Sequence, residues 1–410
     1  MNVRNVRGRN ENLDAFYTLK PLNFVLRMLG LNCIYRDGAV LKYDWSVAKT
    51  TILILLFGGL NVFSLYYKLY IWNGVISFTF KDAIQIVFIF GYFQYLLDLF
   101  YVHKYGRDQL LEYFRIYERI DSVLGKTYFR EIRSSTIHLL ISFTAISFIS
   151  SVIDFSAWLM TFGMPVVVTF FIDYTYVMIR NFSIADVIAQ VTQVLYRLKS
   201  IGDLLKEYHS LSEIAPGVKD IIDEKYSSRK VWKKTSHLVP FKTIDQYEFL
   251  ITKLSGCYLL ILEQCDHINA MYGVRTLAIC LSNLIDIIIL LNLAIRISLD
   301  SMRVYYHGIY PALSSLIRTL ACALVLVYEV YRCQQTYNEI NRIIRYVDYL
   351  LITKNISFEA RDKLRNFRAL VISRPVQFHA VNFYKLDCTL LLSVGSVVVT
   401  YTMILLQNMD

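Results

Sequence analysis

The sequence predicts an all-α membrane protein with seven transmembrane helices, a cytoplasmic N-terminus, an extracellular C-terminus and helices that extend into a cytoplasmic anchor bundle. Of its 410 residues, 55% are hydrophobic and only 19% are charged, a balance too apolar for an ordinary soluble domain. Seven apolar stretches of about 20 residues are each long enough to cross the roughly 30 Å hydrocarbon core of a bilayer. Lys and Arg are concentrated on one side of these stretches.

The predicted spans follow one another along the chain, which forms a single membrane domain over residues 1–410. They cover residues 47–70, 83–103, 135–160, 166–189, 274–299, 310–332 and 389–407. A charged cytoplasmic segment, residues 1–46, precedes the first span, so no cleavable signal peptide is evident. No internal repeat or second domain is evident either.

The distribution of basic residues predicts the orientation. Lys and Arg crowd the N-terminal segment, the connection between the second and third spans, and the long connections after the fourth and sixth spans. Cytoplasmic loops of membrane proteins carry an excess of these residues, so the N-terminus is predicted inside and the C-terminus outside. Basic segments facing anionic lipid headgroups also account for the net charge of +10. A nucleic-acid partner is therefore not expected.

Heptad-spaced apolar residues continue three spans beyond the membrane, within residues 190–272 and 333–388. The three stripes are Val191, Val194, Leu198, Ile201, Leu205 and Tyr208; Ile244, Tyr247, Ile251, Leu254, Tyr258, Ile261 and Cys265; and Tyr337, Ile340, Ile344, Val347 and Leu351. Helices with such narrow stripes bury them against other helices. We expect cytoplasmic helical extensions that form a packed bundle, in which the last helices before the final span either form a subunit interface or pack only within their own subunit. Residues 213–242, with a Pro-Gly turn and a basic run, are predicted to form a mobile linker.

The final span carries polar residues on one face. Thr389, Ser393, Ser396, Thr400, Met403 and Gln407 are spaced by four, three, four, three and four, which keeps them on one helical stripe. Hydroxyl and amide groups on one face of an apolar helix favour a side turned toward water or a partner subunit. The stripe predicts a pore-lining helix, gated by dewetting near Met403, Ile404 and Gln407. The alternative is a packed helix whose Ser and Thr hydroxyls bond carbonyls one turn back.

Polar and aromatic residues in the outer halves of the spans are candidates for a ligand site. They are Asp154, Trp158, Asp173, Tyr174, Tyr176, Asn292, Arg296 and Arg318. Aromatic residues with a few polar groups between helices are what a small-molecule pocket requires, although Trp158 and Tyr174 equally fit an aromatic belt at the membrane interface. Asp286 and Arg318 fall at nearly the same depth by the helical rise. We expect them to form a buried ion pair, with either a functional or a purely structural role.

The sequence does not favour an enzyme. It has no Ser-His-Asp order, phosphate-binding glycine loop or intramembrane zinc motif, so no catalytic residue or cofactor is expected. Cys265 and His267 are two residues apart, which is the wrong spacing to share a helical face, so no metal site is expected. All seven cysteines fall in cytoplasmic or membrane segments, where disulfides are not expected.

The C-terminal end carries a family resemblance. The Thr400-Tyr401 pair, five mostly apolar residues and Gln407 resemble the terminal signature of the insect gustatory receptors, within the wider insect chemoreceptor superfamily. The aromatic-rich residues 383–391 also resemble that family's approach to its last helix, and the layout of spans is similar over the whole chain. One departure is that Asn408 stands where the family usually has Phe.

The resemblance implies a ligand-gated, non-selective cation channel that acts as a taste receptor in the plasma membrane of chemosensory neurons. A small-molecule tastant would bind in the outer half of each subunit, between the second and sixth spans. Four identical or related subunits would surround a central pore for cations, with membrane lipids as further partners. Three alternatives remain: an odorant-receptor-like channel subunit, a G-protein-coupled receptor, which the orientation opposes, and a secondary transporter, whose internal repeats and broken helices are not evident.

Overall fold

A computed structural model describes residues 14–37, 40–43, 46–71, 78–105, 108–125, 128–211, 244–299, 309–353 and 356–407. The predicted linker, residues 213–242, and Asn408 lie outside the described residues. The helices are α1 (Ala15–Met28), α2 (Val47–Ile71), α3 (Phe78–Tyr105), α4 (Asp108–Leu124), α5 (Phe129–Phe162), α6 (Met164–Leu211), α7 (Ile244–Ser298), α8 (Tyr310–Thr353), α9 (Phe358–Ser373) and α10 (Cys388–Gln407). Two short antiparallel hairpins pair β1 (Ile34–Asp37) with β2 (Val40–Tyr43), and β3 (His379–Ala380) with β4 (Tyr384–Lys385).

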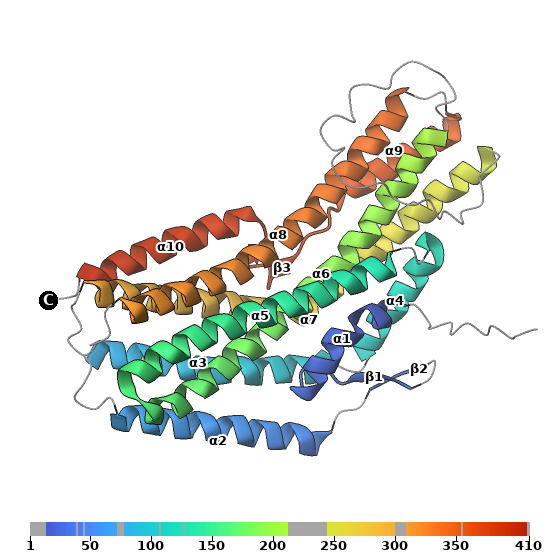
Figure 1. Ribbon diagram of the computed structural model, residues 1–410. Coiled ribbons are helices and arrows are strands. Elements are labelled where there is room, and N and C mark those ends of the chain that lie inside the picture. The colour runs from blue at the N-terminus through green and yellow to red at the C-terminus, as the bar shows by residue number, and fades with distance from the viewer. Residues whose placement is uncertain are drawn as a thin grey trace, which may run out of the picture.

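The all-α membrane fold is confirmed. The seven predicted spans fall on α2, α3, α5, α6, α7, α8 and α10, which form an elongated bundle (Figure 1). Among the described residues, five of these helices, α2, α5, α7, α8 and α10, are long and apolar enough to cross a membrane. In contrast, α6 carries Asp173, Arg180 and Asp186 within its predicted span, and these charges lower its hydropathy.

Helix α6 lies at the centre of the bundle and explains how such charges are tolerated. It contacts α1, α2, α3, α5, α7 and α8, so its polar groups meet protein rather than lipid. Helix α10 lies at an edge, opposite α2 in Figure 1, and contacts α7 and α8. Only 6% of the apolar stretch of α10 is buried within the chain, compared with 50% for α7.

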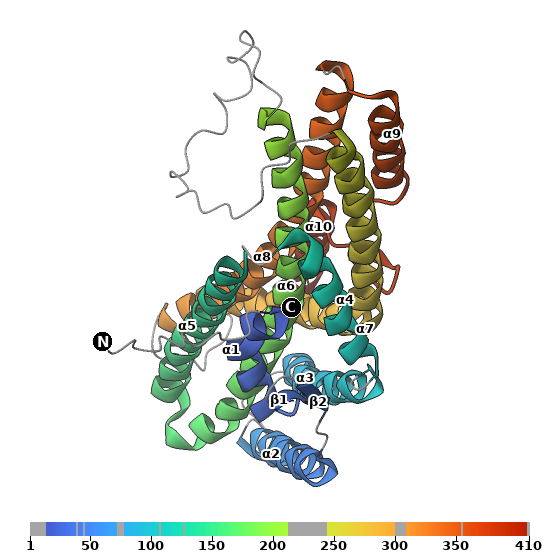
Figure 2. The ribbon, with the colours of Figure 1, turned by 90° about the vertical axis from the view of Figure 1, so that its right-hand side faces the viewer.

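Beyond the spans, α6, α7 and α8 continue as unbroken helices of 48, 55 and 44 residues. Figure 2 shows their ends beside α9. The predicted stripe on α6 is buried, with Val191, Val194, Leu198, Ile201 and Leu205 each at most 1% exposed. On α8 the predicted Tyr337, Ile340 and Val347 are buried, at 8%, 4% and 0% exposed, whereas Ile343 and Leu350, at 0% each, are more buried than the neighbouring predicted Ile344 and Leu351. The stripes therefore pack against one another within one chain, which confirms the anchor bundle.

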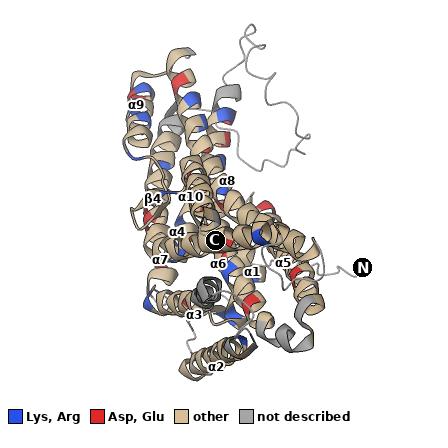
Figure 3. Ribbon diagram, turned by 90° about the vertical axis from the view of Figure 1, so that its left-hand side faces the viewer, with Lys and Arg blue, Asp and Glu red and all other residues tan. Residues whose placement is uncertain are grey.

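Charged side chains are distributed unevenly over these parts. In Figure 3, Lys, Arg, Asp and Glu gather on α9 and the neighbouring helix ends, whereas α2 is almost entirely free of them. A low-charge bundle joined to a charged helical extension is the pattern expected of a membrane protein with an aqueous anchor region.

The β3–β4 hairpin connects α9 to α10 and is bound to α7. Asn269 Nδ2 donates to the carbonyl of Gln377, and its Oδ1 accepts from the His379 amide, both at 3.0 Å. Gly273, one turn along α7, permits this close approach, because a Cβ there would lie 3.1 Å from the backbone nitrogen of Val381. The hairpin thus fixes the start of α10 to α7.

Candidate functional site

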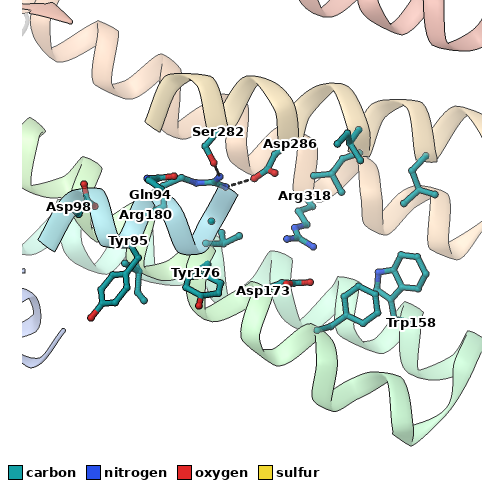
Figure 4. Close-up of a pocket in the computed structure, with 17 residues that line it drawn as sticks. Gln94, Tyr95, Asp98, Trp158, Asp173, Tyr176, Arg180, Ser282, Asp286 and Arg318 are labelled. Carbon is teal, nitrogen blue, oxygen red and sulfur yellow. Dashed lines mark hydrogen bonds and ion pairs between the residues drawn. The ribbon is translucent and has the colours of Figure 1, made fainter. Parts of the chain in front are cut away.

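A cavity of about 100 Å³ lies between α3, α5, α6, α7 and α8 in the membrane-spanning part of the bundle (Figure 4). One part of its wall is aromatic, from Tyr95, Trp158, Phe170 and Tyr176. The rest combines aliphatic side chains of α6 and α7 with polar groups, namely Gln94, Asp98, Asp173, Arg180, Ser282, Asp286 and Arg318. A mixed apolar and polar cavity between helices is the form that small-molecule sites take.

The structure brings part of the predicted ligand set to this cavity. Trp158, Asp173, Tyr176 and Arg318 line it. Asp154 and Tyr174 are buried next to the cavity, where Asp154 bonds residues of the wall and Tyr174 bonds Asp154, as described below. Asn292 is buried on α7.

Arg296 lies elsewhere and has a different role. Its Nη2 donates to the carbonyl of Leu405 at 3.0 Å, which joins the last turn of α7 to the last turn of α10. This contact makes Arg296 a link between the helices that enclose the cavity and the final helix.

Asp154 on α5 is the centre of a buried hydrogen-bond cluster. It is 1% exposed and accepts from Arg318 Nη1 at 2.8 Å, Tyr174 Oη at 2.9 Å, Trp158 Nε1 at 3.2 Å and Ser314 Oγ at 3.3 Å. These donors come from α5, α6 and α8. The cluster fixes the Arg318 guanidinium at the edge of the cavity and satisfies a carboxylate that burial would otherwise penalise.

The predicted Asp286–Arg318 ion pair is wrong. Asp286 Oδ2 accepts from Arg180 Nη2 at 2.5 Å, and Arg180 Nη1 also donates to Ser282 at 2.5 Å. Arg318 pairs instead with Asp154. The helical rise predicts similar depths for both residues, and both line one cavity, but α5 and α6 supply oppositely charged partners at the same level.

A third ion pair, which the sequence reading missed, joins α2 to α6. Lys68 Nζ lies 2.8 Å from Asp173 Oδ2 and 4.3 Å from the centroid of Phe170, whose ring stacks on Trp158 at 4.9 Å. A signal for Lys68 was present in the sequence. Asn61, Ser64 and Lys68 are three and four residues apart, so they share the one buried polar face of an apolar helix.

The sequence does not predict that Arg180 lies in the cavity wall, because its neighbours in sequence carry no signal for such a position. Nothing in the stretch around it distinguishes a residue that faces a cavity from one that snorkels to the interface. Only the position of α6 at the centre of the bundle gives Arg180 a partner on α7 and a place in the wall.

The predicted stripe on α10 is turned away from α7 and α8. Ser393, Ser396, Thr400 and Gln407 are exposed, as are Met403 and Ile404 at 55% and 45%. The opposite face is sheltered, and Thr402 is 6% exposed. This arrangement places the polar residues and the predicted gate residues where a second chain or water could meet them.

The hydroxyls of the stripe also make local bonds, as the alternative interpretation required. Ser393 and Thr400 donate to the carbonyls of Thr389 and Ser396, at 3.1 and 2.9 Å. At the start of α10, Thr389 instead donates through its hydroxyl and amide to Asp387. These bonds hold the pKa of the Asp387 carboxyl below its usual value. Local bonding and an exposed stripe coexist, because each hydroxyl oxygen can still accept a bond from water.

Comparison with solved structures gives the same fold. The chain superposes on the insect olfactory receptor OR5 from Machilis hrabei with a TM-score of 0.56 at 12% identity, over 95% of this chain and 97% of that one. The same receptor in complex with eugenol gives a TM-score of 0.57 at 11% identity, with the same coverage. At this level of identity the likeness concerns the fold alone.

Comparison of sequences identifies the family. No curated protein matches the chain. The profile of the 7tm Chemosensory receptor family, however, matches residues 19–408, which is nearly the whole chain. The span layout, the exposed final helix and this match agree, and the chain belongs to the seven-transmembrane chemosensory receptor family.

Proposed function

We propose that the chain is a gustatory receptor that works as a ligand-gated, non-selective cation channel in the plasma membrane of chemosensory neurons. Membership of the chemosensory receptor family supports the receptor role. The choice of taste over olfaction rests on the terminal signature of Thr400, Tyr401 and Gln407. An olfactory channel subunit is the second candidate, favoured by the fold likeness to the Machilis hrabei receptor.

The observation that carries the channel proposal is the environment of α10. Only 6% of the apolar stretch of this 20-residue helix is buried within the chain, and the helix presents a polar stripe outward. Facing lipid, the hydroxyls would keep only their bonds to backbone carbonyls, and the remaining acceptor sites of the hydroxyls and the Gln407 amide would lose their bonds to water. Facing the axis of a homo- or heterotetramer, the same groups would line a hydrated path, with Met403, Ile404 and Gln407 at its narrow outer end.

Binding in the cavity would act on this helix through α7 and α8. Both helices line the cavity and both contact α10, and Arg296 of α7 bonds the last turn of α10. A tastant that fits the cavity better when α10 is displaced would favour the open arrangement by its difference in affinity for the two states. No carboxylate lies on the stripe, in keeping with weak selectivity among cations.

Cysteine accessibility tests the pore assignment. In a Cys388→Ser background, we expect Ser393→Cys, Ser396→Cys and Thr400→Cys to react with a small charged thiol reagent during current recording, because they face water. We expect Val398→Cys and Leu405→Cys, on the sheltered face, to resist. Equal reaction at both sets, or labelling of the stripe without any change in current, would show that α10 does not line the pore.

The native cysteines should interfere little with this experiment. Cys388 is the exposed native cysteine, and the other six are buried. In the cytoplasmic extension, burial raises the pKa of Cys257 to about 11 and that of Cys265 well above its usual value. These thiols stay protonated at neutral pH, and since the thiolate is the reactive form, they should not contribute to the signal.

A further inference from the structure

Three ion pairs surround the cavity, and in each the more exposed side chain lies in the cavity wall. Arg318, Asp173 and Asp286 have side chains that are 15%, 13% and 10% exposed, whereas their partners Asp154, Lys68 and Arg180 are 1%, 4% and 7% exposed. The exposed members come from α8, α6 and α7. In Figure 4 the guanidinium of Arg318 points into the space between Asp286 and Asp173.

These three side chains keep bonding capacity for a ligand. Among the described residues, Asp173 and Asp286 each accept an ion-pair bond through one carboxylate oxygen, and Arg318 donates to Asp154 through Nη1. Each carboxylate has a second oxygen, and the guanidinium has further N–H groups. The cavity wall therefore offers the Asp173 and Asp286 carboxylates on either side of the Arg318 guanidinium, while the other guanidinium in the wall, Arg180, is held on Asp286 and Ser282.

The pairing also fixes the net charge of the ligand. The three pairs contribute three positive and three negative charges, and Asp98 in the wall pairs with Arg275 at 3.0 Å, which also lies 3.9 Å from Asp186. An anion or a cation would bring an uncompensated charge into a desolvated site, which is costly. An apolar molecule would displace water from the three charged side chains without replacing the hydrogen bonds that the water made.

We propose that the cavity binds a small zwitterionic ligand of the free amino-acid class, with its ammonium group in contact with the Asp173 and Asp286 carboxylates beside the Arg318 guanidinium, and its carboxylate on Arg318. Such a ligand is neutral overall and provides an opposite charge for each exposed ion, in charge-assisted bonds. The aromatic wall of Trp158 and Tyr176 receives the ligand's side chain and can contact its ammonium face-on. This inference rests on the proposed receptor function, and it names the chemical class of the ligand.

A ligand series tests the proposal without altering the fold. Free amino acids are applied to the purified full chain, with thermal unfolding and calorimetry as readouts. The best binder is then compared with its N-acetyl derivative, which lacks the ammonium, and its amide, which lacks the carboxylate. We expect each derivative to bind at least about tenfold more weakly, since each loses one charge-assisted bond. Equal binding of the derivatives, or binding of glucose or eugenol but of no amino acid, would overturn the proposal.

A conservative variant locates the carboxylate. Arg318→Lys keeps a cation for Asp154 but loses the planar fork that binds a carboxylate through two bonds. We expect it to weaken the free amino acid about tenfold and to leave the amide derivative unchanged. The matched control is Arg342→Lys, which alters an Arg–Asp203 pair in the extension and should change neither. Equal weakening of both ligands by Arg318→Lys would contradict the assignment.

Current recordings separate this inference from the channel proposal. Amino-acid binding to the purified chain without any evoked current, in cells that carry the receptor at their surface, would contradict the channel function and leave the ligand class intact. Current evoked by eugenol and by no amino acid would keep the channel and overturn the ligand class.

Discussion

At the scale of single residues, the partner of each buried charge decides what it can do. Lys68, Arg180 and Arg318 are all long basic side chains within the membrane part, and each lies against an acid from another helix. The sequence identified Asp286, Arg318 and the acids of the third and fourth spans as significant, since charges there are costly. It could not assign the pairs, because depth along a helix gives no information on which helix lies opposite.

A double-mutant cycle tests the assignment. We expect Asp286→Ala and Arg180→Ala each to destabilise the protein by about 3–5 kcal/mol, because each leaves a buried ion without its partner. The double variant should be much less destabilised than the sum, with a coupling of about 1–3 kcal/mol. The measurement is the unfolding free energy in detergent.

The control cycle combines Asp286→Ala with Arg318→Ala. These residues line one cavity but bond to different partners, so their losses should be nearly additive. A larger coupling in this cycle than in the Asp286–Arg180 cycle would restore the pairing that the sequence alone suggested.

At the scale of elements, helical periodicity predicted which residues share a buried or an exposed face, and these predictions were largely right. The heptad stripes on α6 and α8 are buried to within one residue, and the polar stripe of α10 lies on a single exposed face. Periodicity works because the helical repeat fixes which residues share a side. It does not specify the neighbour, so the central place of α6 and the attachment of the β3–β4 hairpin to α7 appear only in three dimensions.

Two glycines on α7 give a matched test of the hairpin contact. Gly273→Ala places a methyl group 3.1 Å from the Val381 backbone nitrogen and 3.3 Å from the His379 carbonyl oxygen, and backbone cannot give way as a flexible side chain does. We expect a lower thermal unfolding midpoint and faster hydrogen exchange across the hairpin. Gly256→Ala has nothing within 4 Å of the new methyl and should stabilise the helix by up to about 1 kcal/mol. Equal effects of the two substitutions would show that the close approach is unimportant.

At the scale of the whole molecule, composition and charge bias predicted a seven-span membrane fold, and the family match over residues 19–408 agrees with it. The orientation stays a prediction from the positive-inside rule. The number of subunits also stays a prediction. The apolar stripes of the extension are buried against one another within one chain, so any contact between chains uses other surfaces. Exposed Ile352, Phe358 and Phe383, each more than 80% accessible, are apolar side chains available for such contacts.

Epitope tags test the orientation. A tag after Asp410 should be recognised by antibody on intact cells, and a tag before Met1 should be recognised only after permeabilisation, because the basic segments hold the N-terminal side in the cytoplasm. The two tagged proteins control for each other's expression. The reverse pattern is that of a G-protein-coupled receptor and would contradict both the predicted orientation and the channel proposal.

Helix α10 is fixed more firmly at its start than at its end, so a tilt of the helix displaces mainly its end. Its first residues follow a hairpin held to α7 by Asn269 and Gly273, while near its far end the Leu405 carbonyl accepts a hydrogen bond from Arg296. A 20-residue helix is about 30 Å long, so a tilt of about 5° about its fixed base moves the tip by roughly 2.6 Å and the base hardly at all. Small rearrangements around the cavity would thereby be amplified where Met403 and Gln407 lie, and in the proposed channel the pore would open from its outer mouth inward.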